Sequence, residues 1–158
     1  MRGRIFILVL LLGFPLCLSA FDRRDFDRVA DFSVTLKSLA GLSESQARRL
    51  GGRLLVLDGT VAYLQFLDPE QASFAVELEL VGGEWVGTED VKIYRCRVRF
   101  NGPEFFRRFP RRTPRDPTPE QIVLDDHLLV VARLAGRTTA EDGTPVWVLE
   151  GLHARGLR

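Results

Sequence analysis

The sequence lacks most of the residue types on which catalytic and metal sites depend. Only two of its 158 residues are cysteines and only two are histidines. It contains no glycine-flanked serine, no paired-cysteine zinc pattern and no glycine-rich phosphate loop. His127 follows Asp125 and Asp126, but a metal site needs three or four ligands gathered by the fold, so we expect only a turn there. We therefore expect a non-enzymatic protein with no catalytic residues, no cofactor and no metal.

A large charge of either sign is also missing. The 22 lysines and arginines nearly balance the 21 acidic residues, and loss of Arg2 and Arg4 with the first 20 residues would leave 20 basic residues and a net charge of −1. A near-neutral domain has no overall attraction for phosphate, so any anion-binding surface would have to be local. On this ground we do not expect nucleic acid as a partner.

The apolar run that opens the chain is shorter than the roughly 20 residues that a helix needs to cross a bilayer. It extends over Ile5–Leu18, behind two arginines and ahead of a pair of small residues. A basic start, a short apolar run and a small residue before the cut are typical of a signal peptide. We predict a signal peptide at residues 1–20, cleavage before Phe21, no membrane span afterwards, and export to the periplasm or cell envelope.

The two cysteines leave one alternative open at this end of the chain. Lipid attachment to Cys17 would make the protein a lipoprotein, although the preceding residues, FPL, do not resemble a lipobox. Cleavage before Phe21 removes Cys17, so the mature chain keeps only Cys96 and can form no internal disulfide. The position of Cys96 within a predicted strand indicates a small buried hydrophobic residue.

Helical spacing follows the predicted signal peptide. Apolar residues from Val29 to Leu39 recur at spacings of three, four and three, which favours a helix within residues 21–40 over the shorter alternation that a strand would need. Ser43 and Gln46 form a weak capping box at the start of a second short helix. We predict an N-terminal helical segment at residues 21–52.

Strand patterns begin at residue 53. Residues 53–67 form the longest strand-like run, with Gly59 near its middle. A glycine inside a strand usually marks a bulge or a barrel corner, so we predict a long strand that bends there and serves two halves of one curled sheet.

Two strands with clean alternation follow, at residues 73–81 and 91–100, joined by a glycine-rich loop at residues 82–90. In a hairpin, glutamates of the first strand would lie across from arginines of the second as exposed ion pairs. The glutamates are Glu77 and Glu79, the arginines are Arg95, Arg97 and Arg99, and the inward rows include Phe74, Val76, Leu78, Tyr94, Cys96 and Val98.

Proline punctuates the next part of the chain. Asn101-Gly102-Pro103 ends a strand and starts a short helix through Phe109, with Phe106 and Phe109 on one face. Four prolines between residues 110 and 119 predict an extended, solvated insertion. Strand patterns at 128–137 and 146–153, separated by a turn at Asp142-Gly143, predict a final hairpin.

This order of elements resembles the OB-fold, a five-stranded, partly open Greek-key barrel. The resemblance covers Arg53 to Ala154 and has no diagnostic binding motif. It implies a mainly β domain at residues 53–158, in which the segment GPEFFRRF, residues 102–109, plugs one end of the barrel between the third and fourth strands. The chain looks most similar to exported bacterial members, which implies a non-enzymatic binding or structural module of the cell envelope.

Five arginines in nine residues are the main candidate for a binding site. They begin an insertion rich in arginine and proline at residues 107–119, and guanidinium groups suit phosphate and carboxylate ligands. We expect an envelope protein, a glycan or an anionic lipid as the partner. A nucleic-acid-binding OB domain that uses this loop is the alternative function, and a solvated loop without a ligand is the simplest interpretation. The arginines are Arg107, Arg108, Arg111, Arg112 and Arg115.

Aromatic residues give one further candidate. Trp85 lies on the predicted loop 82–90 and could recognise a ligand, but a tryptophan in such a place more often folds back over a barrel end. OB-folds that hold single strands use aromatic residues on the outer face of the second and third strands. We predict no aromatic residue for stacking on that face, and a self-paired, solvated charge pattern instead.

Overall fold

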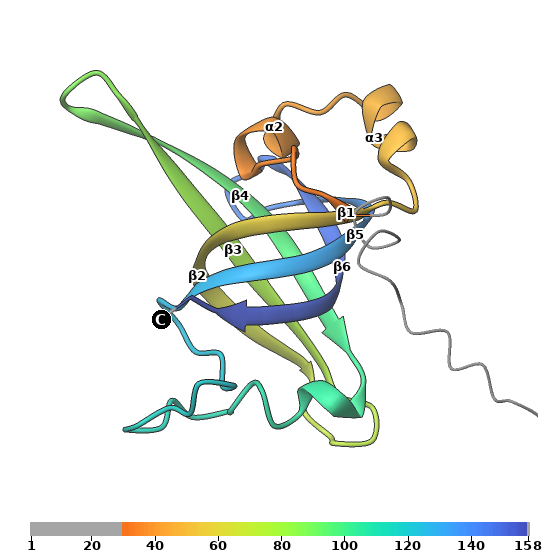
Figure 1. Cartoon of the computed structure of the whole chain (residues 1–158), viewed down its shortest axis with the longest axis vertical. Helices are drawn as coiled ribbons and strands as arrows, with labels where there is room; N and C mark the ends of the chain where they lie inside the picture. The colour runs from red at the N-terminus through yellow and green to blue at the C-terminus, as the bar shows by residue number, and fades with distance from the viewer. Residues whose placement is uncertain (1–29, 158) are drawn as a thin grey trace, which may run out of the picture.

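The structure is a computed structural model that describes residues 30–157. The predicted signal peptide, Cys17 and the first part of the predicted N-terminal helix lie outside the described residues. Figure 1 shows a curled sheet with two short helices over one end. None of the described helices reaches the length and apolarity that a bilayer crossing needs. The elements are β1 (Ala30–Asp31), α2 (Leu36–Ala40), α3 (Glu44–Leu50), β2 (Leu54–Asp68), β3 (Ala75–Val86), β4 (Asp90–Asn101), the 3-10 helix η1 (Pro103–Phe105), β5 (His127–Thr139) and β6 (Pro145–Gly156).

The strand order defines an OB-fold barrel. The sheet runs β1-β2-β3-β4-β6-β5, and an additional pairing of β2 with β5 closes it. The pairs are antiparallel except for β4 with β6 and the short β1 with β2. The β4–β6 seam is short, from Arg97 opposite Val148 to Arg99 opposite Glu150, so the barrel is only partly closed there. The predicted mainly β, five-stranded OB-like architecture is confirmed.

The long strand β2 joins the two halves of the barrel. Residues Leu55 to Thr60 pair with β5, and Thr60 to Asp68 pair with β3. The change of partner falls next to Gly59, where an added Cβ would lie 2.8 Å from both the Leu80 side chain and the Val81 carbonyl oxygen. The predicted division of β2 at Gly59 is therefore confirmed, although the register shifts of the β2–β3 ladder come later in the strand.

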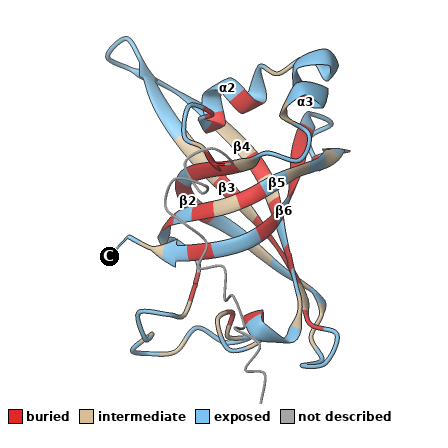
Figure 2. Ribbon diagram, turned by 45° about the vertical axis from the view of Figure 1, so that its right-hand side comes forward, coloured by how far each residue is buried: buried red, intermediate tan, exposed pale blue. Residues whose placement is uncertain are grey.

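The core lies inside the barrel, where the inward rows of the strands meet (Figure 2). Val76, Leu78, Cys96 and Val98 are fully buried, as their alternation predicted. The exception is Tyr94, which is only partly buried because it lies at the edge of the barrel.

The plug of the barrel differs from the predicted helix 102–109. Only Pro103–Phe105 form a 3-10 helix, entered through Gly102 with φ of 128°. Phe105 and Phe109 are buried, because the Phe109 N–H donates to the Phe105 carbonyl and places both rings against Phe100. Phe106, which we expected to insert, is only partly buried.

The N-terminal segment is less helical than predicted. Ala30 and Asp31 pair with β2 as a short strand, so the predicted helix within residues 21–40 is wrong at residues 30–35 and confirmed only at residues 36–40. The Asp31 carboxylate accepts hydrogen bonds from the Ser33 backbone N–H and hydroxyl, a local turn that competes with a helix. The helix starts only at Leu36, capped by Thr35. The predicted second helix is present as α3, with the predicted capping box at Ser43.

The β3–β4 hairpin extends well beyond the barrel (Figure 1). Residues 82–90 are not the predicted loop, because the ladder continues to Val86 opposite Asp90 and only Gly87 to Glu89 form the turn. We call residues 82–94 the arm. Trp85 lies on it in strand conformation with 70% of its surface exposed, so the expectation that it folds back over the barrel end is wrong.

Candidate functional site

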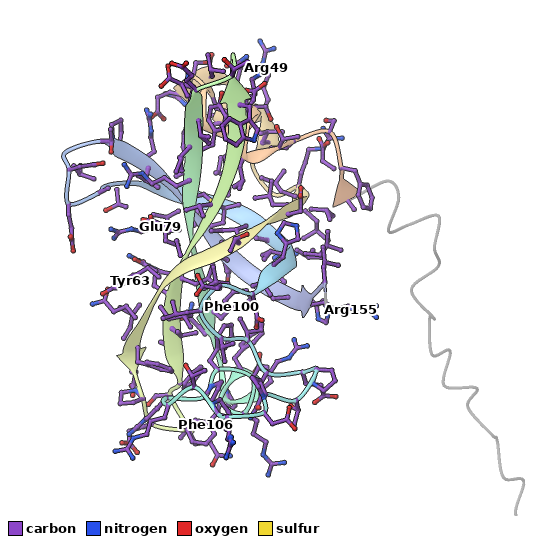
Figure 3. The ribbon with its side chains drawn as sticks, turned by 90° about the vertical axis from the view of Figure 1, so that its left-hand side faces the viewer. Arg49, Tyr63, Glu79, Phe100, Phe106 and Arg155 are labelled. Atoms are coloured by element: carbon purple, nitrogen blue, oxygen red, sulfur yellow. The ribbon has the colours of Figure 1, made fainter. Side chains whose placement is uncertain are left out.

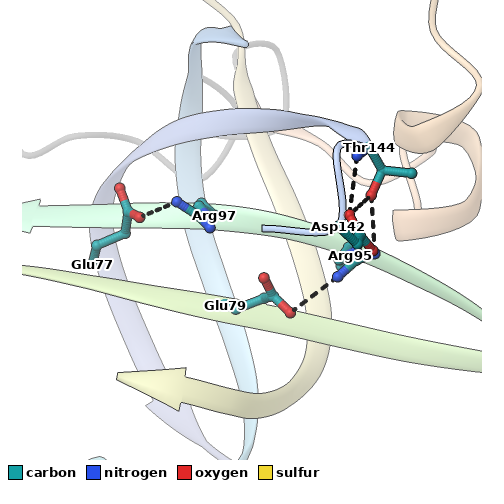
Figure 4. Close-up of polar contacts among 6 residues, drawn as sticks. All are labelled: Glu77, Glu79, Arg95, Arg97, Asp142 and Thr144. Carbon is teal, nitrogen blue, oxygen red and sulfur yellow. Dashed lines mark hydrogen bonds and ion pairs between the residues drawn. The ribbon is translucent and has the colours of Figure 1, made fainter. Parts of the chain in front are cut away.

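The outer face of β3 and β4 carries a network of ion pairs (Figure 4). Glu77 lies opposite Arg99 and Glu79 opposite Arg97, as the alternation predicted. Glu77 binds both neighbouring arginines, with 3.1 Å from its Oε1 to Arg97 Nη1 and 2.5 Å from its Oε2 to Arg99 Nε. The predicted solvated pattern is wrong at Glu77, which is only 4% exposed because the two arginine side chains cover it.

Arg95 ties the β5–β6 turn to this face. Its guanidinium contacts Asp142, donates to the Thr144 hydroxyl at 3.1 Å and lies 3.9 Å from Glu79. Hydrogen bonds from the Thr144 hydroxyl and backbone N–H, and then from Arg95, lower the pKa of Asp142 to about 2. Each of the three β4 arginines thus has a carboxylate partner, and the face offers little free positive charge to a polyanion.

An exposed aromatic ring lies beside this network. Tyr63 of β2 is opposite Glu79 and 51% exposed (Figure 3). It lines a shallow hollow of about 310 Å³ together with Glu79, Arg95 and the β5–β6 turn. Our prediction of no stacking aromatic residue concerned residues 73–81 and 91–100, so it did not cover Tyr63, which the neighbouring strand β2 places beside that face. The polar Gln65, two residues further along β2, was a signal that Tyr63 points outward.

The five arginines predicted as a site, which we call the arginine cluster, lie at the other end of the barrel from the arm (Figures 1 and 3). The buried rings of Phe105 and Phe109 anchor the start of their segment. The Ile122 N–H donates to the Arg108 carbonyl at 2.7 Å and closes the base of the insertion. Arg111 donates to the Pro69 carbonyl at 2.7 Å, which ties the insertion to the β2–β3 loop.

The arginine cluster lacks the carboxylate partners that the β4 arginines have. Within residues 30–157, every ion pair of 4.0 Å or less involves other side chains. Four of the five arginines are exposed, and Arg108 is partly buried. Five guanidinium groups are therefore gathered at one end of the barrel without an acidic counterpart.

His153 of β6 lies near one arginine of this cluster, Arg108. Burial lowers the pKa of His153, and the nearby positive charges of Arg108 and Arg155 lower it further. Arg155 and His153 lie on β6, more than 40 positions along the chain from Arg108. The proximity of His153 to Arg108 follows from the fold of the barrel, so local sequence could not reveal it.

The other titratable groups form no catalytic arrangement among the described residues. His127 opens β5, with Nδ1 at 3.3 Å from Thr60 Oγ1 and Nε2 at 3.8 Å from Asp58 Oδ2, on an exposed surface. Between residues 30 and 157 no three histidine, cysteine or acidic side chains come close enough to hold a metal ion. Cys96 is fully buried, which raises the pKa of its thiol.

No protein-family model and no curated protein matches the sequence. Among solved structures the chain is similar to the protein PriB from Ralstonia solanacearum, with 11% identity and a TM-score of 0.40 over 66% of this chain and 97% of that one. A small single-stranded DNA-binding protein from Streptomyces coelicolor has 16% identity and a TM-score of 0.39 over 65% of this chain and 90% of that one. An SSB from Plasmodium falciparum in complex with single-stranded DNA has 11% identity and a TM-score of 0.39 over 66% and 94%. This likeness is remote, and the OB-fold assignment rests on the strand order and closure of this chain.

The last two neighbours are named as a single-stranded DNA-binding protein and an SSB in complex with single-stranded DNA, which is the reverse of our expectation that nucleic acid is not a partner. That expectation, and the envelope protein, glycan or anionic lipid preferred in its place, came from the near-neutral overall charge. The overall balance is a poor guide here because charge is distributed unevenly over the surface. Carboxylates pair with the β4 arginines, whereas the arginine cluster has no such partner among residues 30–157.

Proposed function

We propose that this chain is a non-enzymatic OB-fold domain that binds single-stranded nucleic acid through the arginine cluster. One observation carries the proposal: five arginines are gathered at one end of the barrel, and no carboxylate within the described residues pairs with them. A guanidinium group donates two parallel hydrogen bonds to a phosphate and keeps its charge at any physiological pH. OB barrels hold oligonucleotides or oligosaccharides, and of these the oligonucleotide carries the row of phosphates that such a cluster suits.

The mode of binding follows from the surroundings of the cluster. Of the rings nearest in the chain, Phe105 and Phe109 are buried in the barrel, and Phe106 is partly buried and packs edge-on against Phe74, so none is displayed for stacking on bases. Contacts are therefore made to the phosphate backbone, which carries no sequence information. We expect an affinity typical of non-specific electrostatic binding, with Kd of about 10⁻⁴ to 10⁻⁶ M at physiological salt.

Fluorescence anisotropy with a labelled oligonucleotide tests the proposal. The variant Arg111→Ser, Arg112→Ser, Arg115→Ser removes three exposed guanidinium groups without touching the buried anchors. Each phosphate contact to a single strand contributes about 0.7 log units of affinity at 0.1 M salt, so loss of three should weaken binding about a hundredfold. A duplex of the same length, measured in parallel, shows whether the single strand is preferred.

A second triple variant is the matched control. Arg48 and Arg49 of α3 and Arg133 of β5 are also exposed and have no ion pair within the described residues. Changing these three to serine alters the net charge equally and should leave the affinity within about threefold, because distant charges are largely screened. Equal losses in the two variants would show that only net charge matters, and absence of binding by the wild type would refute the proposed function.

The outer face provides a separate check. Tyr63 is the exposed ring beside the hollow, where single strands stack in OB-folds that use that face. Because the arginines around it are already paired, we expect Tyr63→Ser to change the affinity less than about threefold. A loss of about 1–3 kcal/mol in binding free energy is the usual contribution of one stacked base. Such a loss would show that the oligonucleotide binds at the outer face and not at the arginine cluster.

We also propose that the protein is exported. Support comes from residues 1–20 alone, whose basic start, short apolar run and small residues resemble a signal peptide. The intact mass of the exported chain should correspond to a first residue of Phe21. A mass that retains Cys17 with acyl chains would instead identify a lipoprotein.

A further inference from the structure

The arm presents a surface that the barrel does not use. Trp85 lies opposite Val91, and Gly83 lies opposite Ile93, so these four residues share one face of the hairpin. Trp85, Val91 and Ile93 are 70%, 46% and 65% exposed. An exposed apolar group of this kind on a projecting element marks an interaction site more often than an idle surface.

The arm is braced in its position. On its other face α2 packs against its base, with Leu36 over Gly82 and Lys37 Nζ at 2.8 Å from Glu84. The Tyr94 hydroxyl donates to the same carboxylate at 3.0 Å. These contacts on the opposite face fix the arm in place, so the apolar face is already ordered before a partner binds. This lowers the entropy cost of binding.

Both edges of the arm are open among the described residues. The pairing of β3 with β2 ends at Val81, and β6 pairs with β4 only at residues 97–99. Glu84 is already paired with Lys37, and Glu89 and Asp90 outnumber Lys92 at the tip of the arm, which leaves a charge of −1 there. This acidity disfavours a nucleic acid and favours a basic partner.

A surface with the complementary chemistry lies on the same protein. Residues 107–119 carry five arginines, one aspartate and four prolines, a net charge of +4. Arginine and proline side chains both pack on the face of an exposed tryptophan. The arm and this segment are at opposite ends of the barrel, so they cannot meet within one molecule (Figures 1 and 3).

We infer that the arm of one molecule binds the arginine-rich segment of a second copy, so that Trp85 packs on arginine and proline side chains and the acidic tip faces guanidinium groups. Such a contact joins two different surfaces and is heterologous. It therefore continues from copy to copy as a ring or an open chain and does not stop at a symmetric dimer. The inference shares the arginines of the proposed function but needs no nucleic acid.

Sedimentation velocity over a range of protein concentrations tests this inference. The wild type should form species larger than a dimer at low salt and dissociate as salt rises. Trp85→Ser on the arm and the triple variant Arg111→Ser, Arg112→Ser, Arg115→Ser on the segment should each weaken association at least about tenfold, as loss of a central aromatic or arginine contact does. The variant Arg48→Ser, Arg49→Ser, Arg133→Ser should associate like the wild type.

Mixing the two defective proteins gives the decisive result. Trp85→Ser keeps its arginines and the triple variant keeps its arm, so an equimolar mixture should form a dimer and nothing larger. A mixture that stays monomeric, or a wild type that stays monomeric at every concentration, would overturn the inference. Circular dichroism of each variant confirms folding beforehand.

Oligonucleotide binding separates this inference from the proposed function. Trp85→Ser should bind the oligonucleotide as the wild-type monomer does. If it loses oligonucleotide affinity instead, the arm belongs to a nucleic-acid site and self-association through it is wrong. If no variant and no wild type binds the oligonucleotide, the proposed function fails while the result of the mixing experiment stands.

Discussion

Replacing Glu77 with alanine should destabilise the barrel far more than replacing Glu79, although both glutamates lie on the outer face of β3. The Glu77 side chain is 5% exposed and accepts hydrogen bonds from Arg97 and Arg99. A hydrogen bond to a charged group contributes about 1.5–3 kcal/mol, and removing one partner of a buried ion pair leaves the other charges uncompensated. Arg99 is 48% exposed and can turn into water, which recovers part of the loss. We expect Glu77→Ala to lower the free energy of unfolding by about 2–4 kcal/mol.

Glu79 is the internal control for this prediction. Its side chain is 18% exposed, its carboxylate is 3.9 Å from Arg95, and Arg95 keeps Asp142 as a partner when Glu79 is lost. Glu79→Ala should therefore cost less than about 1 kcal/mol, like other partly exposed ion pairs. The two glutamates lie two residues apart on the same face of the same strand, so intrinsic strand propensity cancels between the two variants.

Urea denaturation of the wild type and both variants measures the two losses. The midpoints should shift while the slopes stay the same, because the change is in stability alone. The isosteric Glu77→Gln should fall between the wild type and Glu77→Ala, since an amide oxygen can still accept from one arginine. Equal losses at the two positions, or a loss below about 1 kcal/mol for Glu77→Ala, would refute the assignment of Glu77 as a buried structural carboxylate.

Three further predictions concern the barrel. Gly59→Ala should cost about 1–3 kcal/mol in urea denaturation because its Cβ would lie 2.8 Å from a backbone oxygen, whereas Gly136→Ala, with no atom within 4 Å, should cost much less. Hydrogen bonds from Thr144 lower the pKa of Asp142 to about 2. The ionised carboxylate therefore stabilises the fold above the unfolded pKa of about 3.9, and this contribution is lost as the pH falls toward 2. Between these two pH values the variant Asp142→Asn should lose less stability than the wild type. Because burial raises the pKa of the Cys96 thiol, a thiol reagent should label it only after unfolding, and labelling of the native protein would show that it is accessible.

The sequence was informative where one face of a strand is buried and the other is not. The alternation along β3 and β4 predicted which residues point inward and that the glutamates of β3 would face the arginine row of β4; the register that sets Glu77 opposite Arg99 comes from the structure. It could not predict that Glu77 is buried, since alternation records the direction of a side chain and not what covers it. Two arginine side chains from the next strand cover this carboxylate, and that packing depends on the register between strands.

The two glycines at the base of the arm do not mark the loop that their pattern predicted. Gly82 and Gly83 suggested a loop, yet both lie within β3, where Leu36 packs close to Gly82 and Val91 close to Gly83. A glycine in a strand can mark such a close approach as well as a turn, and sequence alone does not separate the two cases. The exposure of Trp85 follows from the continued strand and could not be predicted from a loop.

The arginine cluster could be found from the sequence, but its significance could not. Five arginines in nine residues are visible as a pattern, whereas the three β4 arginines, equally visible, are neutralised by carboxylates from β3 and from the β5–β6 turn. Whether a charge is paired depends on contacts between distant residues. The same reasoning applies to His153, which the fold brings near Arg108 from a distant part of the chain.

The salt dependence of oligonucleotide binding tests the central claim most directly. For single strands, the slope of log Kobs against log salt concentration is about −0.7 for each phosphate contact. If the arginine cluster binds phosphates, the variant Arg111→Ser, Arg112→Ser, Arg115→Ser should have a slope about 2 units shallower than the wild type, while the variant Arg48→Ser, Arg49→Ser, Arg133→Ser keeps the wild-type slope. Identical slopes for all three proteins would contradict the claim that these arginines contact the nucleic acid.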